Sequence, residues 1–212
     1  NSNDLLPQDM GGTGGLGDNK IYGNSGNNKL TAMGGSDTLI GGPGNDTLIG
    51  DSGANTSAGA ADDARMEGGE GNDTYELMRD GDVIYEEAGE GVDLVRSHVT
   101  HTLAEYVEKL WLEGTAAIDG TGNALDNTIT GNDGANVLDG KEGNDRLIIG
   151  DDTLEGVGID TLKGGLGDDT LHGSGNPNDS RGGLLKGGQG DDTYFLVQPG
   201  DVIDEEAGGG VD

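Results

Sequence analysis

The chain has 212 residues, of which 45 are glycine, only 31% are apolar and only 3% are aromatic, so it has little material for an ordinary packed core. Acidic residues outnumber basic ones by 41 to 11, giving a net charge of -30, and the few scattered basic residues argue against a nucleic acid as partner. The absence of cysteine excludes disulfides and thiolate metal sites, and no apolar run approaches the roughly 20 residues of a membrane span.

A nine-residue pattern, Gly-Gly-x-Gly-x-Asp-x-apolar-x, recurs along the chain. The complete copies span residues 41–49, 68–76, 164–172 and 187–195. Weaker copies begin at Gly14, Gly23, Gly131 and Gly140, and another surrounds Asp37. Acids and glycines in so fixed an order indicate a repeat array that assembles cation sites, rather than a disordered polyanion.

The pattern predicts oxygen-lined turns that alternate with short strands. Glycines at the first, second and fourth positions permit φ > 0, which turns carbonyl oxygens toward a common point, and the aspartate at the sixth position adds a carboxylate. Ca²⁺ takes roughly six to eight such oxygens, so two stacked turns must share one ion. Positions seven to nine predict a strand with its central residue turned inward. The expected inward ladder comprises Leu39, Leu48, Tyr75, Leu147, Leu162, Leu171 and Tyr194.

Residues 1–93 form the first expected array, which is degenerate around 50–67 and ends in a GDVI-type extension. If two nonapeptides make one coil, sixth-position residues 18 apart in sequence should stack in columns. Asparagine at such a position keeps an oxygen ligand but lacks the charge. This spacing predicts one column of Asn19, Asp37, Asn55 and Asp73, and a second of Asn28, Asp46 and Ala64.

Residues 94–120 break the pattern and are expected to form a connecting β segment. Leu110 and Leu112 flank Trp111 in an alternation typical of a strand. As the single tryptophan of an aromatic-poor chain, Trp111 is expected to fill or cap the core. His98 and His101 lack the spacing of a zinc motif, so neither is expected to bind metal.

Residues 121–212 form the second expected array, with a surface loop at 173–183 and a truncated C-terminus. Its aspartates at 145, 152, 160 and 169 are spaced by seven, eight and nine residues, which predicts loops of varied length. Residues 187–212 repeat residues 68–93 at an offset of 119. We therefore expect one continuous elongated domain that belongs to a longer protein.

These repeats, with the stretches GDVIYEEAGEGVDLV at 81–95 and VEKLWLEG at 107–114, resemble the repeats-in-toxin (RTX) family over nearly the whole chain. The resemblance implies an all-β fold, a right-handed parallel β-roll of glycine-rich nonapeptide repeats that binds several Ca²⁺ ions. Modules of this family look like parts of secreted bacterial toxins, adhesins, proteases, lipases and epimerases. Such proteins leave the cell through type I machinery.

Calcium ligands are expected from the repeat pattern and the resemblance together. The expected side-chain ligands are Asp37, Asp46, Asp73, Asp82, Asp93, Asp145, Asp152, Asp160, Asp169, Asp192, Asn19 and Asn28. The resemblance also implies carbonyl ligands from Gly42, Gly44, Gly69, Gly71, Gly165, Gly167, Gly188 and Gly190.

The expected function is that of a non-catalytic calcium-binding module, secreted or displayed on a bacterial surface. The chain would leave the cell as a disordered polyanion and fold once calcium is available, because metal binding then supplies folding free energy. Its expected partners are the rest of a larger parent chain, and a cell-surface polysaccharide or neighbouring rolls.

Two alternatives remain open from the sequence. In the first, the chain is the accessory module of a secreted enzyme, such as a protease, lipase or polysaccharide epimerase, whose catalytic part lies elsewhere. In the second, it is a polysaccharide- or ice-binding adhesin module, which predicts an exposed row of aromatics or threonines on a flat face. The threonines at position seven are Thr38, Thr47, Thr74, Thr161, Thr170 and Thr193.

Overall fold

The computed structural model describes residues 11–51, 63–150, 159–173, 182–196, 199–205 and 209–211. Within these ranges the chain forms twenty strands and no helix, so the all-β class is confirmed. It follows that no described helix is long and apolar enough to cross a membrane. The chain divides into two compact units, residues 1–99 with 104–107, and residues 100–103 with 108–212.

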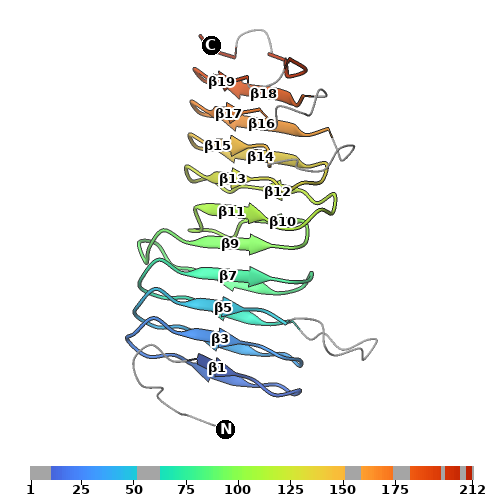
Figure 1. The fold of residues 1–212 in the computed structure, drawn as a ribbon. Helices are drawn as coiled ribbons and strands as arrows, with labels where there is room; N and C mark the ends of the chain where they lie inside the picture. The colour runs from blue at the N-terminus through green and yellow to red at the C-terminus, as the bar shows by residue number, and fades with distance from the viewer. Residues whose placement is uncertain are drawn as a thin grey trace. The chain divides into compact units, whose positions relative to one another are not determined.

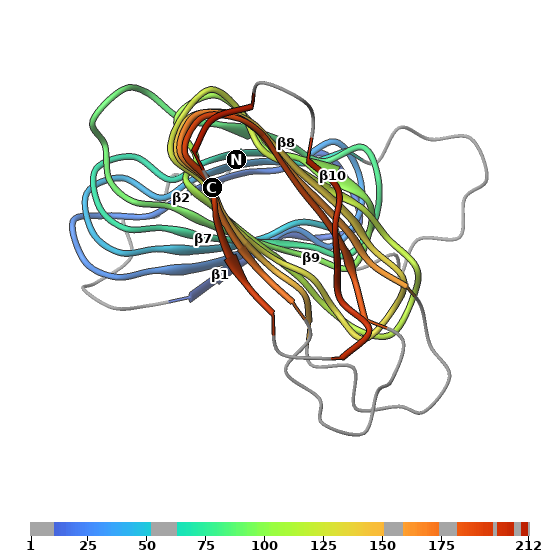
Figure 2. The ribbon, with the colours of Figure 1, turned by 90° about the horizontal axis from the view of Figure 1, so that it is seen from above.

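The first unit alternates between two parallel sheets, which form two facing layers (Figures 1 and 2). Because each strand pairs with the next but one in sequence, two strands and two turns make one coil of a parallel β-roll. One sheet consists, in order, of β1 (Gly11–Thr13), β3 (Lys29–Thr31), β5 (Thr47–Ile49), β7 (Thr74–Leu77) and β9 (Leu94–Ser97). The other consists of β2 (Lys20–Tyr22), β4 (Thr38–Ile40), β6 (Arg65–Glu67) and β8 (Val83–Tyr85).

The second unit follows the same plan, so the expected parallel β-roll is confirmed in both units. Its first sheet consists, in order, of β11 (Lys109–Leu112), β13 (Thr128–Thr130), β15 (Arg146–Ile148), β17 (Thr170–His172) and β19 (Thr193–Phe195). Its second sheet consists of β10 (His101–Thr102), β12 (Gly120–Thr121), β14 (Val137–Glu142), β16 (Thr161–Leu166), β18 (Leu184–Gln189) and β20 (Val202–Ile203).

Most of the three-residue strands turn their central side chain into the space between the two sheets. Aliphatic residues fill this space, and full burial of one such side chain contributes roughly 1.5–3 kcal/mol. The predicted inward ladder is confirmed at its fully buried members, whereas Tyr194 is partly exposed. The fully buried members are Leu39, Leu48, Tyr75, Leu147, Leu162 and Leu171.

The stacking register of the first unit differs from the prediction at one coil. Asp73 stacks on Asp46, 27 residues away, rather than on Asp37. Ala64 in turn stacks on Asp37. The prediction that stacked sixth-position residues are always 18 residues apart is therefore wrong here. The segment between β5 and β6 lengthens one coil by nine residues, so that Ala64 and Asp73 each lie in the column predicted for the other. Asn55, assigned to the first column from the sequence, lies outside the described residues.

The connecting segment 94–120 forms strands, as the alternation of Leu110 and Leu112 predicts. Both leucines are buried in β11, whereas Trp111 between them points outward and is 48% exposed. The expectation that Trp111 fills or caps the core is therefore wrong. The period of two that buries both leucines also turns the intervening side chain to the opposite face.

The position-seven threonines do not gather in one row. Thr47 and Thr74 are neighbours in one sheet of the first unit, and Thr170 and Thr193 are neighbours in one sheet of the second. Both rows end at a basic residue, because Lys29 lies opposite Thr47 and an arginine lies opposite Thr170. The described residues therefore do not form the continuous threonine face that one alternative predicts.

Candidate metal-binding loops

The loops between strands adopt the left-handed backbone that the glycine pattern predicts. The glycines at the second and fourth positions have φ values between 96° and 141°, a region that side chains with a Cβ resist. In the loop 140–145 the second position is Lys141, which takes a φ of 85°. The stacked coils thus impose this turn even where glycine is missing. The glycines concerned are Gly42, Gly44, Gly69, Gly71, Gly165, Gly167, Gly188 and Gly190.

In the first unit, sixth-position residues are joined from coil to coil by hydrogen bonds. The Asn28 amide donates to Asp46 Oδ1 (2.7 Å), Asp46 to Asp73 Oδ1 (2.6 Å) and Asp73 to Asp93 Oδ1 (2.7 Å). Each aspartate therefore uses one oxygen to hold the preceding coil. We call this row the Asp46 column; it consists of Asn28, Asp46, Asp73 and Asp93.

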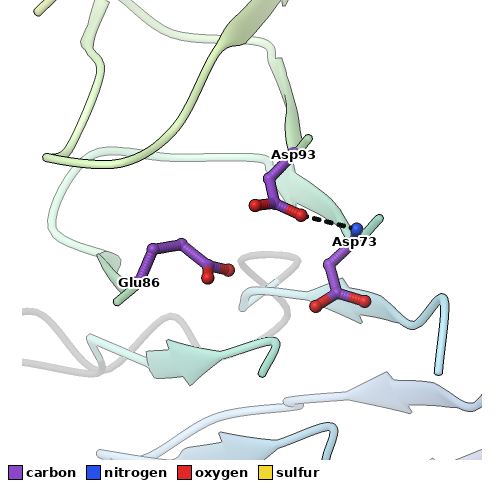
Figure 3. Close-up of side chains that lie close together, drawn as sticks. All are labelled: Asp73, Glu86 and Asp93. Atoms are coloured by element: carbon purple, nitrogen blue, oxygen red, sulfur yellow. Dashed lines mark hydrogen bonds between the residues drawn. The ribbon is translucent and has the colours of Figure 1, made fainter. Parts of the chain in front are cut away.

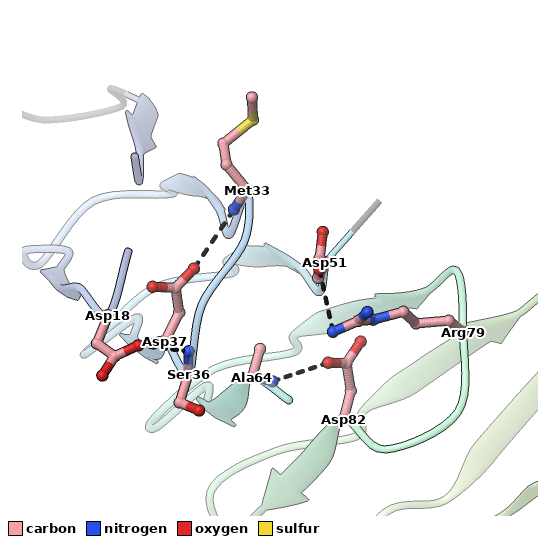
Figure 4. Close-up of polar contacts among 8 residues, drawn as sticks. All are labelled: Asp18, Met33, Ser36, Asp37, Asp51, Ala64, Arg79 and Asp82. Carbon is pink, nitrogen blue, oxygen red and sulfur yellow. Dashed lines mark hydrogen bonds and ion pairs between the residues drawn. The ribbon is translucent and has the colours of Figure 1, made fainter. Parts of the chain in front are cut away.

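The opposite side of the first unit carries a second row. The Asn19 amide donates to Asp37 Oδ1 at 2.8 Å. The Ala64 amide donates to Asp82 Oδ1, also at 2.8 Å (Figure 4). Alanine at one position interrupts the carboxylates. The sequence-predicted ligands Asp37 and Asp82 thus lie in one column, separated by a coil without a ligand side chain.

The second unit repeats the two rows. Amides of Asn127, Asp145 and Asp169 donate to the Oδ1 atoms of Asp145, Asp169 and Asp192 at 2.7–2.9 Å. On the other side, Asn136 donates to Asp160 Oδ1 (2.7 Å).

One candidate ligand of the second row was missed from the sequence. Asp201 Oδ1 accepts from the Gly183 amide at 2.9 Å, in the place that Asp82 holds in the first unit. The offset of 119 between the two long repeats could have identified it, since Asp82 was already a predicted ligand. Asp152, a predicted ligand, and residues 174–181 of the predicted loop lie outside the described residues.

The second carboxylate oxygens of several column aspartates are buried without a hydrogen-bond partner within the described ranges. Leaving a buried polar group unsatisfied costs about 1–3 kcal/mol, more for a charged one. The oxygens concerned are Oδ2 of Asp46, Asp73, Asp82, Asp145 and Asp169.

The space around these oxygens is enclosed by the first glycine of each loop. A Cβ on Gly41 would overlap Asp46 Oδ2 and lie 2.6 Å from the Gly68 carbonyl oxygen, which holds the equivalent place one coil later. A Cβ on Gly164 would likewise overlap Asp169 Oδ2. Each such cradle is lined by carboxylate and carbonyl oxygens, the donor set that calcium prefers. The residues present therefore fit a bound calcium ion.

The protein supplies little positive charge to these carboxylates. Desolvation by burial raises the pKa of Asp73 to about 7, and the nearby charge of Asp46 adds to this effect. Burial also raises the pKa of Asp169 to about 7 and that of Asp145 to about 6. A cation within the columns would offset this unfavourable burial of charge.

Asp82 is the exception, because a basic residue approaches it. Burial raises the pKa of Asp82 to about 6, but the Arg79 guanidinium acts in the opposite direction. Arg79 also forms an ion pair with the buried Asp51 (3.0 Å; Figure 4). This column is thus partly neutralised by the protein itself.

Asparagines at the sixth position form hydrogen bonds within their own loops. Asn28 Oδ1 accepts from the Asn24 amide (2.6 Å), and Asn127 Oδ1 accepts from the Asn123 amide (2.7 Å). Asn136 also donates through its side-chain nitrogen to the Ile118 carbonyl. These loops are closed by their own hydrogen bonds, so a cation is less necessary there than at an aspartate.

A parallel roll whose glycine turns enclose rows of buried carboxylates defines a metal-binding repeat module. The RTX calcium-binding nonapeptide repeat matches the chain in four copies, at residues 13–48, 49–84, 121–153 and 156–176, which together cover more than half of it. The chain therefore belongs to this family, as the motifs predict, and its repeats are calcium-binding motifs. No curated protein matches the chain.

Proposed function

We propose that the chain is a calcium-dependent folding module of a larger secreted protein, with Ca²⁺ ions held between successive loops of each column. The buried Oδ2 oxygens of Asp46, Asp73, Asp145 and Asp169 carry this proposal, because they have no hydrogen-bond partner among the described residues and need a positive counter-charge. Its role is structural, in folding after export and in spacing or display, and no catalysis is assigned to it.

The proposed ligands follow the four columns. Carbonyl oxygens of the predicted second and fourth glycines complete each site, with Asn19 and Asn28 as weaker ligands at the starts of two columns. Gly42 O and Gly44 O lie against the equivalent glycines of the next loop, which supports sharing of one ion by two loops. The aspartates proposed as ligands are Asp37, Asp82, Asp46, Asp73, Asp93, Asp145, Asp169, Asp192, Asp160 and Asp201.

The folding mechanism follows from the charge. With a net charge of -30, the calcium-free chain repels itself and would bury its carboxylates at high cost, so it remains unfolded. Bound calcium supplies the neutralising charge, and the sixth-position aspartates and glycine turns then close each coil on the next. Extracellular calcium modules have dissociation constants of about 10⁻⁴ to 10⁻³ M, which suits folding outside rather than inside a cell.

Two substitutions within one loop test this function. Asp145→Asn preserves the acceptor for the Asn127 amide but removes the charge of a buried ligand, whereas Glu142→Gln removes an exposed charge. In calcium titrations followed by circular dichroism, we expect Asp145→Asn to raise the folding midpoint several-fold and Glu142→Gln to leave it nearly unchanged. Equal midpoints for all three proteins would refute the proposal.

A second candidate function, binding of a polysaccharide, is favoured by one observation. The outward row Trp111, Thr130, Ile148, His172 and Phe195 follows the strand register of the second unit. Both Trp111 and Phe195 are 48% exposed, and the His172 and Phe195 rings stack at 4.4 Å. Such rings suit stacking against sugar rings.

Pull-down on insoluble cellulose and chitin in the presence of calcium tests this candidate. We expect Trp111→Ala combined with Phe195→Ala to lose retention, while Tyr22→Ala, which removes an exposed aromatic of the first unit, retains it. No retention of the unsubstituted chain on either polymer would count against this candidate.

A further inference from the structure

The Asp46 column ends at a loop that departs from the nonapeptide pattern. β6 pairs with β8 so that Glu67 lies opposite Tyr85, which places Glu86 opposite Gly68, the first glycine of its loop. In ordinary loops this position is glycine because a side chain would enter the cradle. A glutamate here therefore directs a third carboxylate toward the space between two loops.

The geometry of this carboxylate is shown in Figure 3. Glu86 is only 5% exposed, and its carboxylate faces Asp73 and Asp93, which are each 1% exposed. One ligand oxygen from each residue lies within 4.8 Å of the others. Glu86 Oε2 and Asp73 Oδ2 are buried and have no hydrogen-bond partner among the described residues. Two uncompensated oxygens thus point into one small, acidic space.

Tyr75 holds this arrangement in place. It occupies the inward ladder position where the preceding coil has Leu48. Its hydroxyl accepts a hydrogen bond from the Gly68 amide (2.7 Å) and donates one to Glu86 Oε1. The polar tip of an otherwise buried ring therefore fixes the orientation of the Glu86 carboxylate and leaves Oε2 available for another partner.

The same combination recurs at the end of the second unit. Tyr194 accepts from the Gly187 amide at 2.7 Å, as Tyr75 accepts from Gly68. β18 pairs with β20 so that Leu185 lies opposite Ile203, which places Glu205 opposite Gly187. Tyrosine and glutamate thus replace leucine and glycine together at both column ends, which indicates that they act as a pair.

We propose that Asp73, Glu86 and Asp93, positioned by Tyr75, form a distinct calcium site that binds Ca²⁺ more tightly than the sites between two ordinary nonapeptide loops. The proposal rests on the calcium-dependent function above and adds a site with its own ligand type. An ordinary site draws on at most two stacked aspartates, whereas this one has three carboxylates. Because more ligand charge raises calcium affinity, the column end should fill first and start the ordering of the coils.

A pair of adjacent glutamates provides a matched test. Glu86→Gln removes the buried ligand charge, and Glu87→Gln removes an exposed charge one residue away. The probe is calcium alone, titrated calorimetrically into the full chain from a chelator-treated state. We expect the unsubstituted chain and Glu87→Gln to show the same tight class of sites. Glu86→Gln should lose one ion from that class, or bind it at least tenfold more weakly, while folding normally at saturating calcium.

A second variant covers the case in which Glu86→Gln does not fold at any calcium concentration. Tyr75→Phe keeps all three carboxylates but removes the hydroxyl that orients Glu86, so the tight class should weaken without being lost. Unchanged tight binding in Glu86→Gln, or in Tyr75→Phe if the first variant cannot fold, would overturn the proposal. A proton shared by the three carboxylates, rather than a calcium ion, would then compensate their burial. Absence of any calcium binding by the unsubstituted chain would instead refute the proposed function.

Discussion

At the scale of single residues, the two oxygens of several sixth-position aspartates have different roles. In Asp169, Oδ1 accepts the amide of Asp145 in the preceding coil at 2.7 Å, whereas Oδ2 is buried and has no hydrogen-bond partner among the described residues. Asparagine can perform the first role but not the second, since it carries no charge. The Oδ1 hydrogen bond therefore holds neighbouring coils together in the folded chain, whereas Oδ2 contributes to stability only when a cation is present.

The cradle glycines give a prediction at this scale. In Gly164→Ala, the new Cβ would overlap Asp169 Oδ2 and lie 2.5 Å from the Gly187 carbonyl oxygen. A forced clash of this kind costs typically about 1–3 kcal/mol, so the calcium midpoint should rise by about tenfold. Gly17→Ala is the control, because no atom lies within 4 Å of its added Cβ. Circular dichroism at increasing calcium concentration measures both midpoints. Equal shifts of the two midpoints would contradict the inference that the first glycine of each loop encloses the calcium site.

His101 gives a prediction about pH. Desolvation by burial lowers the pKa of this histidine to about 4, below its ordinary 6.5. The unfolded chain therefore binds a proton that the folded chain excludes, so stability falls as the pH decreases from about 6.5 toward 4. Relative to His101→Gln, the unsubstituted protein should lose free energy of unfolding across this window at saturating calcium. The exposed His98→Gln variant should follow the unsubstituted protein, and parallel curves for all three would contradict the prediction.

At the scale of strands and loops, each coil is stabilised by one or two buried ladder residues and by its contacts with the coils next to it. In Leu147→Ala, loss of a fully buried side chain in β15 should lower the free energy of unfolding at saturating calcium by about 2–5 kcal/mol. Leu166→Ala, at a 44% exposed position in β16, is the control. Denaturant unfolding measures both, and similar losses would show that the inward ladder is not the core.

The strands and most of the candidate site could be predicted from the sequence, because the glycines of the nonapeptide indicate the turn and its apolar position indicates the inward residue. The stacking register could not be predicted, because the additional residues between β5 and β6 carry no motif that indicates which coil they lengthen. The column order of Asp46 and Asp73 depends on that length. The role of Glu86 could not be predicted, because its burial depends on the pairing between β6 and β8.

At the scale of the whole molecule, the acidic composition makes folding unfavourable, and the fold places part of the negative charge in columns. A chain with 41 acidic residues and 3% aromatic residues has a thin core and strong self-repulsion, so packing alone offers little stability. The columns place part of that charge where a cation can neutralise it. Under the proposed function, the free energy of calcium binding becomes a large part of the free energy of folding, and it depends on the calcium concentration of the surroundings.

The most direct test of this account is a comparison of the full chain in calcium, in magnesium and in chelator at equal ionic strength. Circular dichroism reports β-structure, and small-angle scattering reports the radius of gyration, which is roughly 50 Å for an unfolded chain of this length. We predict a cooperative gain of β-structure and a marked compaction near millimolar calcium, reversed by chelator and absent with magnesium. A chain that stays folded and compact in chelator would contradict the claim that calcium drives folding.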